Sequence, residues 1–385
     1  MKGPRVLHVI TGLRTGGAEM MLLKLASSTA DRVLVVSLTG DGPMGDRMRE
    51  AGVEVRSLGM RPGVPDPRAV PRLLRIVREW RPDLMQTWMY HADLLGGLAG
   101  RLAGVPVVWN IRQSTLDRTT SKLHTRVTLA LCARLSHRLP ARIVSCSRSG
   151  SNLHTNLGYD GSRIVLIPNG FDVDHFRPDP AARAAVRRET GVPADVPLIG
   201  LIARFDPQKD HRSFLAAAAL LRVRWPDARF LLCGDGLDKE NDVLHGWIRA
   251  HRLDDRVLLL GRRADVNRIM ASLDVATSAS YQEGFPNVIG EAMATGLPCV
   301  VTDAGDSAFI VGETGIVVPV RDPEGLARGW SKVLSLHPAE RSRLGDAARS
   351  RVMNRFSLTI AVRRYEALYS QVSTNERLER HHEAG

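Results

Sequence analysis

Short β-branched segments alternate with helical patterns along this chain, and the alternation occurs in two rounds. In the first round we expect seven strands, at residues 5–10, 33–38, 53–57, 84–87, 105–110, 143–147 and 164–167. The helices between them are expected at 17–28, 43–51, 67–80, 92–102 and 121–139. Strands that alternate with helices form mostly parallel sheets, so this round predicts a doubly wound α/β domain.

A second round follows a stretch that is rich in alanine, proline and arginine. Its expected strands lie at 198–203, 229–233, 257–260, 275–278 and 298–302. A chain of 385 residues is also too long for one average domain. We therefore expect an α/β chain with two Rossmann-like doubly wound domains, at residues 1–175 and 198–355. A linker at 176–197 would join them, and a C-terminal helix with a polar tail would occupy 356–385.

The composition fits a globular cytoplasmic protein. Its four cysteines are scattered without a CxxC pair, which favours buried, reduced thiols over a disulfide framework or a zinc site. The first 13 residues are typical of a first strand and not of a signal peptide. No apolar segment approaches the roughly 18–20 residues that a membrane span requires.

The formal net charge of +12 is concentrated in one region. Acidic residues are absent between Asp117 and Asp160, and two sets of basic residues are spaced by four, as on one side of a helix: Arg118, Lys122 and Arg126, then Arg134, Arg138 and Arg142. A solvated helix face and docking onto an anionic membrane surface both remain open. We do not expect nucleic-acid binding, because no recognition motif and few aromatic residues accompany the charge.

Two glutamates near the end of the second round, Glu283 and Glu291, flank the turn 284–287. The pattern places Glu283 in a loop after a strand and Glu291 inside the next helix. Open α/β sheets bind ligands at this edge, where the N–H groups at a helix start attract anions. A carboxylate deeper in the pocket is suited to accept hydrogen bonds from sugar or ribose hydroxyls.

Phosphate-binding candidates follow the first strand of each round. Gly16 and Gly17 open a helix whose first N–H groups can approach a phosphate, although a tight turn explains them equally well. Arg204 and Lys209 follow the strand at 198–203. This pair can clamp a diphosphate and neutralise its charge as it departs, and the alternative is a pair of surface ion pairs.

Two further motifs are interpreted as structural. The GxGxxG sequence at 40–45 follows the second strand, and Pro43 removes one of the N–H donors that a dinucleotide loop needs. Asp172 and Asp174 have the form of a metal-binding DxD motif, but they lie in a turn that leads into the expected linker. We expect a turn and a cap there, and no metal site.

These residues, in this order, resemble the family-four glycosyltransferases, which have the GT-B fold of two facing Rossmann-like domains. The resemblance covers most of the chain and is carried by the sequences at 16–19, 167–178, 203–211, 234–236, 283–306 and 313–327. It implies a retaining transferase that uses a nucleotide-diphosphate sugar and requires neither a metal nor another cofactor.

The resemblance also implies roles for individual residues. Arg204 and Lys209 would bind the diphosphate, Glu283 would contact hydroxyls of the transferred sugar, and Glu291 would hold the ribose. Amides around Phe285 and Asn287 would contact the sugar or phosphate, and the amide of Gly17, next to Gly16, would bind the distal phosphate.

The acceptor side departs from the family pattern. Many members carry a histidine at the end of the strand that matches 105–110, and this chain has none there. Asn110, Arg112 and His91 are the candidates to replace it.

The function expected from these observations is hexose or N-acetylhexosamine transfer to a lipid-linked glycan during cell-surface polysaccharide synthesis. The enzyme would be cytoplasmic and peripheral on the inner face of the cell membrane. A small soluble acceptor is one alternative, and a non-catalytic nucleotide-sugar-binding protein is another.

Overall fold

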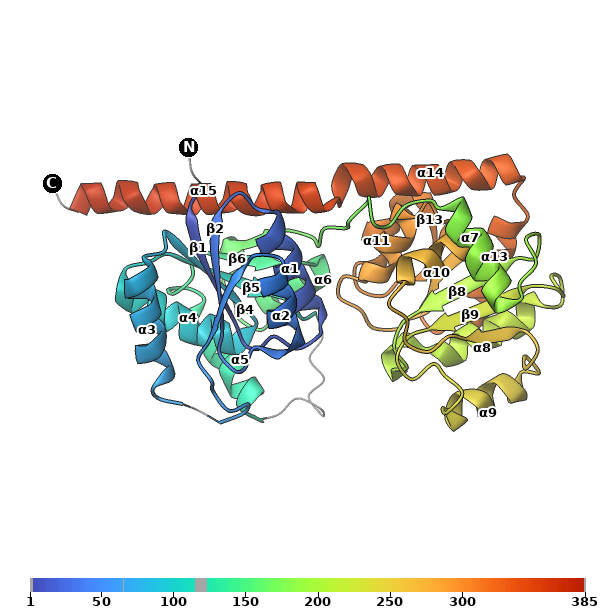
Figure 1. Cartoon of the computed structure of the whole chain (residues 1–385), viewed down its shortest axis with the longest axis horizontal. Coiled ribbons are helices and arrows are strands. Elements are labelled where there is room, and N and C mark those ends of the chain that lie inside the picture. Colours follow the sequence, from blue (N-terminus) through green and yellow to red (C-terminus); the bar gives the residue numbers. More distant parts are fainter. Residues whose placement is uncertain (1–2, 65, 115–122, 384–385) are drawn as a thin grey trace. The chain divides into compact units, whose positions relative to one another are not determined.

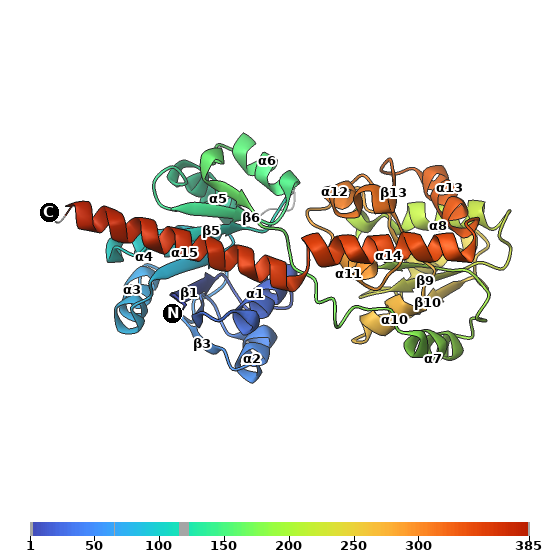
Figure 2. The same ribbon diagram turned by 90° about the horizontal axis from the view of Figure 1, so that it is seen from above.

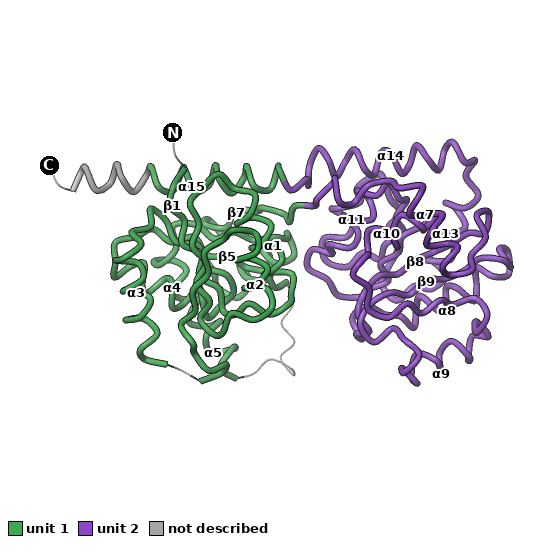
Figure 3. The backbone as a smooth tube through the Cα atoms, in the orientation of Figure 1, with its two compact units in different colours: residues 1–170, 359–385 green, residues 171–358 purple. Residues whose placement is uncertain are grey.

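The computed structural model describes residues 3–64, 66–114 and 123–383, with only the backbone from 375 onward (Figure 1). The chain divides into two compact units, and the last part of the chain returns to the first of them (Figure 3). Unit 1 consists of Met1–Gly170 and Thr359–Gly385, and unit 2 consists of Phe171–Leu358.

Unit 1 is built on a sheet of seven parallel strands in the order β3-β2-β1-β4-β5-β6-β7. Its strands are β1 (Arg5–Ile10), β2 (Arg32–Ser37), β3 (Glu54–Ser57), β4 (Leu84–Trp88), β5 (Val107–Ile111), β6 (Arg142–Ser145) and β7 (Ile164–Leu166). Its helices are α1 (Gly17–Ser28), α2 (Gly42–Glu50), α3 (Ala69–Trp80), α4 (Tyr90–Ala103), α5 (Leu123–Leu135), α6 (Arg148–Asn156), the short η1 (Gly161–Arg163) and α15 (Leu358–Glu383).

The two faces of this sheet are covered by helices. Alternate residues of the central strands, among them Leu7, Met85 and Trp109, form one hydrophobic core with residues of α3, α4 and α5. On the other face, Gln86 and Asn110 meet Tyr369 and Tyr365 of α15. Figure 2 shows α15 (red) running across unit 1. Because both faces are covered, β4 and β5 are buried along their whole length.

Unit 2 contains a second parallel sheet, with six strands in the order β10-β9-β8-β11-β12-β13. The strands are β8 (Leu198–Ile202), β9 (Arg229–Cys233), β10 (Val257–Leu259), β11 (Val275–Ser278), β12 (Cys299–Thr302) and β13 (Gly315–Val318). The helices are α7 (Pro180–Thr190), η2 (Pro207–Lys209), α8 (His211–Leu221), α9 (Asp242–Ala250), α10 (Val266–Ser272), α11 (Asn287–Ala294), α12 (Ser307–Val311), η3 (Gly312–Thr314), α13 (Pro323–Leu334) and α14 (Pro338–Arg355).

The α/β fold class with two doubly wound domains is confirmed. The stretch expected as a linker, 176–197, lies inside unit 2 and contains α7. This helix is well specified locally, because Asp179 caps the N–H of Ala182 at 2.8 Å, Pro180 occupies the first turn and Gly191 ends the helix with a φ of 68°.

The helix expected at 121–139 is shorter than the pattern suggested. Among the described residues α5 ends at Leu135, and the N–H of Arg138 turns back to the carbonyl of Leu135 at 3.0 Å before Pro140. The expected shared helix side of Arg134, Arg138 and Arg142 is therefore wrong, since Arg142 begins β6. Arg118 and Lys122 lie outside the described residues.

All four cysteines are buried and free, as expected. In the part of the chain that the structure describes, no helix has the length and apolar character that a membrane crossing needs.

Candidate functional site

The candidate donor site lies at the carboxyl edge of the sheet in unit 2. Strands β8 and β11 are neighbours in this sheet, with Leu201 beside Thr277, so the loops that follow them emerge side by side. Lys209 belongs to η2, after β8, and Glu283 lies in the loop after β11. Neighbouring parallel strands thus bring together two residues that are 74 positions apart in the sequence.

Lys209 and Glu283 form an ion pair at this edge of the sheet. The ammonium group of Lys209 contacts Oε1 of Glu283, and the hydroxyl of Ser280 donates to the same oxygen at 2.7 Å. The two charged side chains are only 22% and 11% exposed, so the attraction between them is screened less than that of a surface pair. The cluster offers a cation for a phosphate and a carboxylate for hydroxyl groups in one place.

Arg204 lies on the same edge but is more open to solvent. Its guanidinium is paired with Asp206 at 2.9 Å, and its side chain is 66% exposed. The carboxylate of Asp206 also accepts the N–H of Gln208 at 3.0 Å, which fixes the turn into η2. Arg204 and Lys209, the expected phosphate ligands, are therefore both ion-paired in this structure. The alternative interpretation of these residues as surface ion pairs predicts the same contacts.

The turn after Glu283 leads directly into α11. Phe285 is buried and stacks on Phe171 with ring centroids 5.9 Å apart, so its ring is held in the core of unit 2. Asn287 begins α11, and Glu291 lies half-buried one turn further along. The predicted positions of Glu283 after a strand and Glu291 inside the next helix are confirmed.

Residues that we did not single out from the sequence hold this turn in place. The N–H of Asp306 donates to the carbonyl of Gly284 at 2.9 Å. Gly305 has a φ of 58°, and a β-carbon there would collide with the carbonyl of Glu283. The glycine between Ala304 and Asp306 was a signal for such a close approach, whereas nothing in the sequence pointed to Ser280.

In unit 1, Gly16 and Gly17 are positioned as expected. Gly16 precedes α1 in an extended conformation, and Gly17 begins the helix with open space around the position of a β-carbon. Glu19, in the first turn, has a raised pKa because it is partly buried, while a backbone hydrogen bond and the charge of Arg112 oppose the rise. Glu19 at the start of α1 is therefore near enough to Arg112, the residue after β5, for their charges to interact.

The three acceptor-side candidates have different surroundings. Arg112 is half-buried, donates to Oδ1 of Asn169 at 2.6 Å and lies over the ring of Trp88. Asn110 is completely buried, and its amide donates to the hydroxyl of Tyr365 at 3.3 Å. Asn110 is thus part of the core, and Arg112, which follows β5, is the more accessible of the two.

His91 lies on α4, and its ring is 5.6 Å from that of His124 on α5. Burial, and then the neighbouring His124, lower the pKa of His91. The ring is therefore neutral near pH 7 and can both donate and accept hydrogen bonds.

The two motifs interpreted as structural have structural partners. Gly42 opens α2 with a φ of 58°, where a β-carbon would collide with the carbonyl of Leu13. Oδ1 of Asp172 accepts the N–H groups of Asp174 and His175 at 3.1 and 2.9 Å, as in a turn. No group of side chains suited to hold a metal ion occurs among the described residues.

Two protein-family models match this chain. A family model described as "Glycosyl transferase 4-like domain" matches residues 16–170, and one described as "Glycosyl transferases group 1" matches residues 196–335. The "Putative glycosyltransferase EpsF" of Bacillus subtilis (strain 168) is 32% identical over 316 residues, which cover 78% of this chain and 79% of that protein.

A second relative is the UDP-Gal:alpha-D-GlcNAc-diphosphoundecaprenol alpha-1,3-galactosyltransferase of Escherichia coli, which is 25% identical with 81% of each chain covered. Among solved structures, HepE of Anabaena in complex with UDP matches with a TM-score of 0.85 over 95% of this chain and 100% of that chain, at 23% identity. The fold is thus that of HepE, and the chain belongs to the GT-B glycosyltransferases.

Proposed function

We propose that this protein transfers a hexose or an N-acetylhexosamine from a nucleotide-diphosphate sugar to a lipid-linked glycan, with retention of the anomeric configuration. The observation that carries the proposal is the cluster of Lys209, Glu283 and Ser280 at the start of the turn into α11. It combines a phosphate ligand with a sugar ligand, and Glu291 follows on the adjoining helix.

The ion pair suggests how the donor is bound. A diphosphate carries more negative charge than one carboxylate, so it competes with Glu283 for the ammonium group of Lys209. The carboxylate of Glu283 is then available to accept hydrogen bonds from hydroxyls of the sugar. In this proposal Glu291 accepts hydrogen bonds from the ribose, and the amides near Phe285 and Asn287 contact the sugar or phosphate.

During transfer, the bond between the anomeric carbon and the distal phosphate oxygen breaks, and a bond to the acceptor oxygen forms on the same face. The proton of the acceptor hydroxyl passes to the departing phosphate. Lys209 and Arg204 stabilise the charge that develops on this leaving group, the task that a divalent cation performs in other transferases. We therefore expect transfer to persist in the presence of EDTA, and we assign no residue as a nucleophile.

The test of the donor site measures slow hydrolysis of the donor and transfer to an acceptor. We expect Lys209→Ala and Glu283→Ala to lower both rates by roughly 100-fold or more. Lys239→Ala and Glu240→Ala remove the same charges from exposed positions of unit 2 and should leave both rates unchanged. A thermal-shift panel of nucleotide sugars identifies the donor beforehand. Tight donor binding without turnover under any acceptor would instead support a nucleotide-sugar-binding protein.

The lipid-linked acceptor is supported by the Escherichia coli relative and by one surface of unit 1. Leu123, Val127 and Leu131 follow one another at spacings of four along α5 and are 73%, 52% and 44% exposed. The exposed Arg126 and Arg134 lie on the same helix. Exposed aliphatic residues flanked by arginines suit docking onto an anionic lipid surface. We propose a cytoplasmic enzyme that is peripheral on the inner face of the membrane.

Vesicle sedimentation tests this surface. We expect Val127→Ser with Leu131→Ser to reduce binding to vesicles that contain phosphatidylglycerol. Val223→Ser, at an exposed position of unit 2, is the control and should bind as the unaltered chain does. A comparison of acceptors with and without a lipid anchor separates this proposal from transfer to a small soluble acceptor. One relative, the 2-deoxystreptamine N-acetyl-D-glucosaminyltransferase of Streptomyces fradiae, has a name that indicates a small acceptor of this kind.

A further inference from the structure

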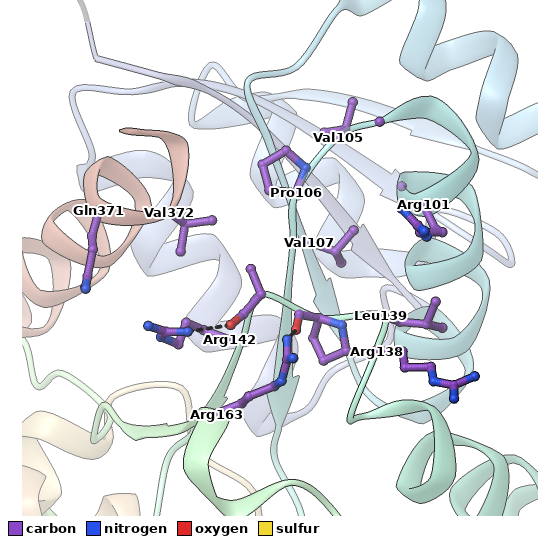
Figure 4. Close-up of a pocket in the computed structure, with 14 residues that line it drawn as sticks. Arg101, Val105, Pro106, Val107, Arg138, Leu139, Arg142, Arg163, Gln371 and Val372 are labelled. Atoms are coloured by element: carbon purple, nitrogen blue, oxygen red, sulfur yellow. Dashed lines mark hydrogen bonds between the residues drawn. The ribbon is translucent and has the colours of Figure 1, made fainter. Parts of the chain in front are cut away.

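A cavity in unit 1 lies at the amino ends of three neighbouring strands, β5, β6 and β7. Its volume is about 380 Å³, within the range of ligand pockets. Four arginines line it: Arg101, Arg138, Arg142 and Arg163. None of its lining residues is acidic. In the view of Figure 4, Arg101 and Arg138 lie on one side of the cavity and Arg142 on the other, with Arg163 between them.

The positive charge of the cavity is only partly compensated. Arg163 donates to the carbonyls of Pro140 and His137 at 2.5 and 3.1 Å and to Asp160 at 3.0 Å. Arg142 donates to the carbonyl of Ala141 at 2.9 Å. Backbone carbonyls orient these guanidinium groups but do not neutralise them, so among the described side chains Asp160 compensates one charge of four.

The side chains of Arg101 and Arg138 form no hydrogen bond or ion pair with another described residue, and both are exposed at the cavity. The C-terminal end of α4 favours a basic residue, which accounts for Arg101 by itself. It does not account for Arg138, Arg142 and Arg163, which come from a turn, from the start of β6 and from η1. The convergence of four guanidinium groups from four elements is the feature to be explained.

We propose that this cavity binds a phosphate-bearing anion. Guanidinium groups present paired N–H donors that match phosphate oxygens, and two of these groups are already oriented by the backbone. Apolar residues, among them Val105, Pro106 and Val372, form part of the lining and limit access of water to the bound anion. A strongly positive, partly enclosed pocket of this kind favours an oxyanion over a neutral ligand.

The bound anion is not the reacting donor. Strand β5 runs from Val107, at the cavity, to Ile111, next to Arg112, and at about 3.3 Å per residue this is roughly 13 Å. The site therefore acts as an anchor or as a regulatory site, separate from the proposed transfer. The phosphate has two possible sources: the headgroup of an anionic lipid, which would hold the edge of unit 1 against a membrane, or a free phosphorylated solute.

The experiment compares two double variants of the full chain. Arg101→Ala with Arg138→Ala removes two charges from the cavity, and Arg75→Ala with Arg78→Ala removes two from the exposed side of α3 in the same unit. Thermal stability is measured in inorganic phosphate and in chloride of equal ionic strength. All chains also carry Lys209→Ala, so that phosphate at the proposed donor site does not contribute. Sedimentation with phosphatidylcholine vesicles, with and without phosphatidylglycerol, is the second arm.

We expect phosphate to stabilise the parent chain and the α3 variant, and the cavity variant to require about tenfold more phosphate for the same shift. If the source is a lipid, the cavity variant also sediments less with phosphatidylglycerol, and inorganic phosphate displaces the parent chain. If the source is a solute, sedimentation is the same for both variants. An equal response of both variants to phosphate and to vesicles would overturn the proposal. Arg101→Lys with Arg138→Lys keeps the charge and the fold and should bind phosphate with intermediate strength.

Discussion

Asp93 is a carboxyl group enclosed in the core of unit 1, where it has no charged partner among the described residues. Its side chain is fully buried, and Oδ1 accepts the hydroxyl of Thr87 at 2.5 Å. Oδ2 has no hydrogen-bond partner among the described residues. Burial raises the pKa of Asp93 from 3.8 to about 8, against the opposing hydrogen bonds of Thr87 and the Asn110 amide. The group is therefore protonated in the folded protein at neutral pH.

This residue makes stability depend on pH. Between pH 4 and pH 8 the folded chain holds a proton on Asp93 that the unfolded chain has released, so the free energy of unfolding falls as pH rises. Two buried histidines of the same unit, His8 and His154, have pKa values lowered by burial to about 3 and about 4. They raise stability with pH, but only up to about 6.5, where unfolded histidine loses its proton.

We therefore expect the free energy of unfolding of unit 1 to fall by roughly 1 kcal/mol between pH 7 and pH 8. Asp93→Asn keeps an acceptor for Thr87 and removes the titration, so its stability should be constant over this interval. Urea unfolding at closely spaced pH values measures the slope. Asp46→Asn, at a position 73% exposed, is the control and should keep the slope of the parent chain. An unchanged slope in Asp93→Asn would contradict the assignment.

Among the elements, α11 is the one whose packing most directly supports the candidate donor site. A β-carbon at Gly290, inside this helix, would overlap the ring of Phe171. Phe171 is buried and stacks on Phe285, which belongs to the turn between Glu283 and α11. The absence of a side chain at Gly290 thus allows the two rings to approach the helix.

We expect Gly290→Ala to lower the free energy of unfolding of unit 2 by about 1–3 kcal/mol, because the ring of Phe171 must shift. The shift moves Phe285, so donor affinity should fall in the same variant. Gly246→Ala, in α9, is the matched control, since nothing lies within 4 Å of its β-carbon position. That change should stabilise the chain by roughly 0.5–1 kcal/mol. Equal effects of both changes would show that α11 has room for the extra methyl group.

The sequence predicts elements of this kind well and their contacts poorly. The strand before Glu283 and the helix that carries Glu291 follow from periodicity and turn residues, which are local signals. The pairing of Lys209 with Glu283 depends on β8 lying beside β11, and strand order is not a local property. The last strand of unit 2, β13, was not predicted, although it is as long as β11 and β12, which were.

At the scale of the whole molecule, the chain leaves unit 1 at residue 170 and returns to it at residue 359. The returning helix α15 buries five large side chains in unit 1: Val362, Tyr365, Leu368, Tyr369 and Val372. The hydroxyl of Tyr369 donates to Gln86, a buried residue of β4. Unit 1 is therefore completed by a segment that is synthesised after all of unit 2.

Removal of α15 should consequently unfold unit 1 and spare unit 2. Burying five large side chains contributes roughly 7–15 kcal/mol, which is comparable to the whole stability of a typical domain. We expect limited proteolysis of a chain that ends at Leu358 to digest residues 1–170 and to leave a resistant fragment near 171–358. This fragment contains Lys209, Glu283 and Glu291, so it should still bind the nucleotide identified by the thermal-shift panel. A chain that ends at Thr374 retains the five buried side chains and should resist proteolysis in both units. If the chain that ends at Leu358 protects residues 1–170 equally well, α15 is an accessory to unit 1 and not a part of its core.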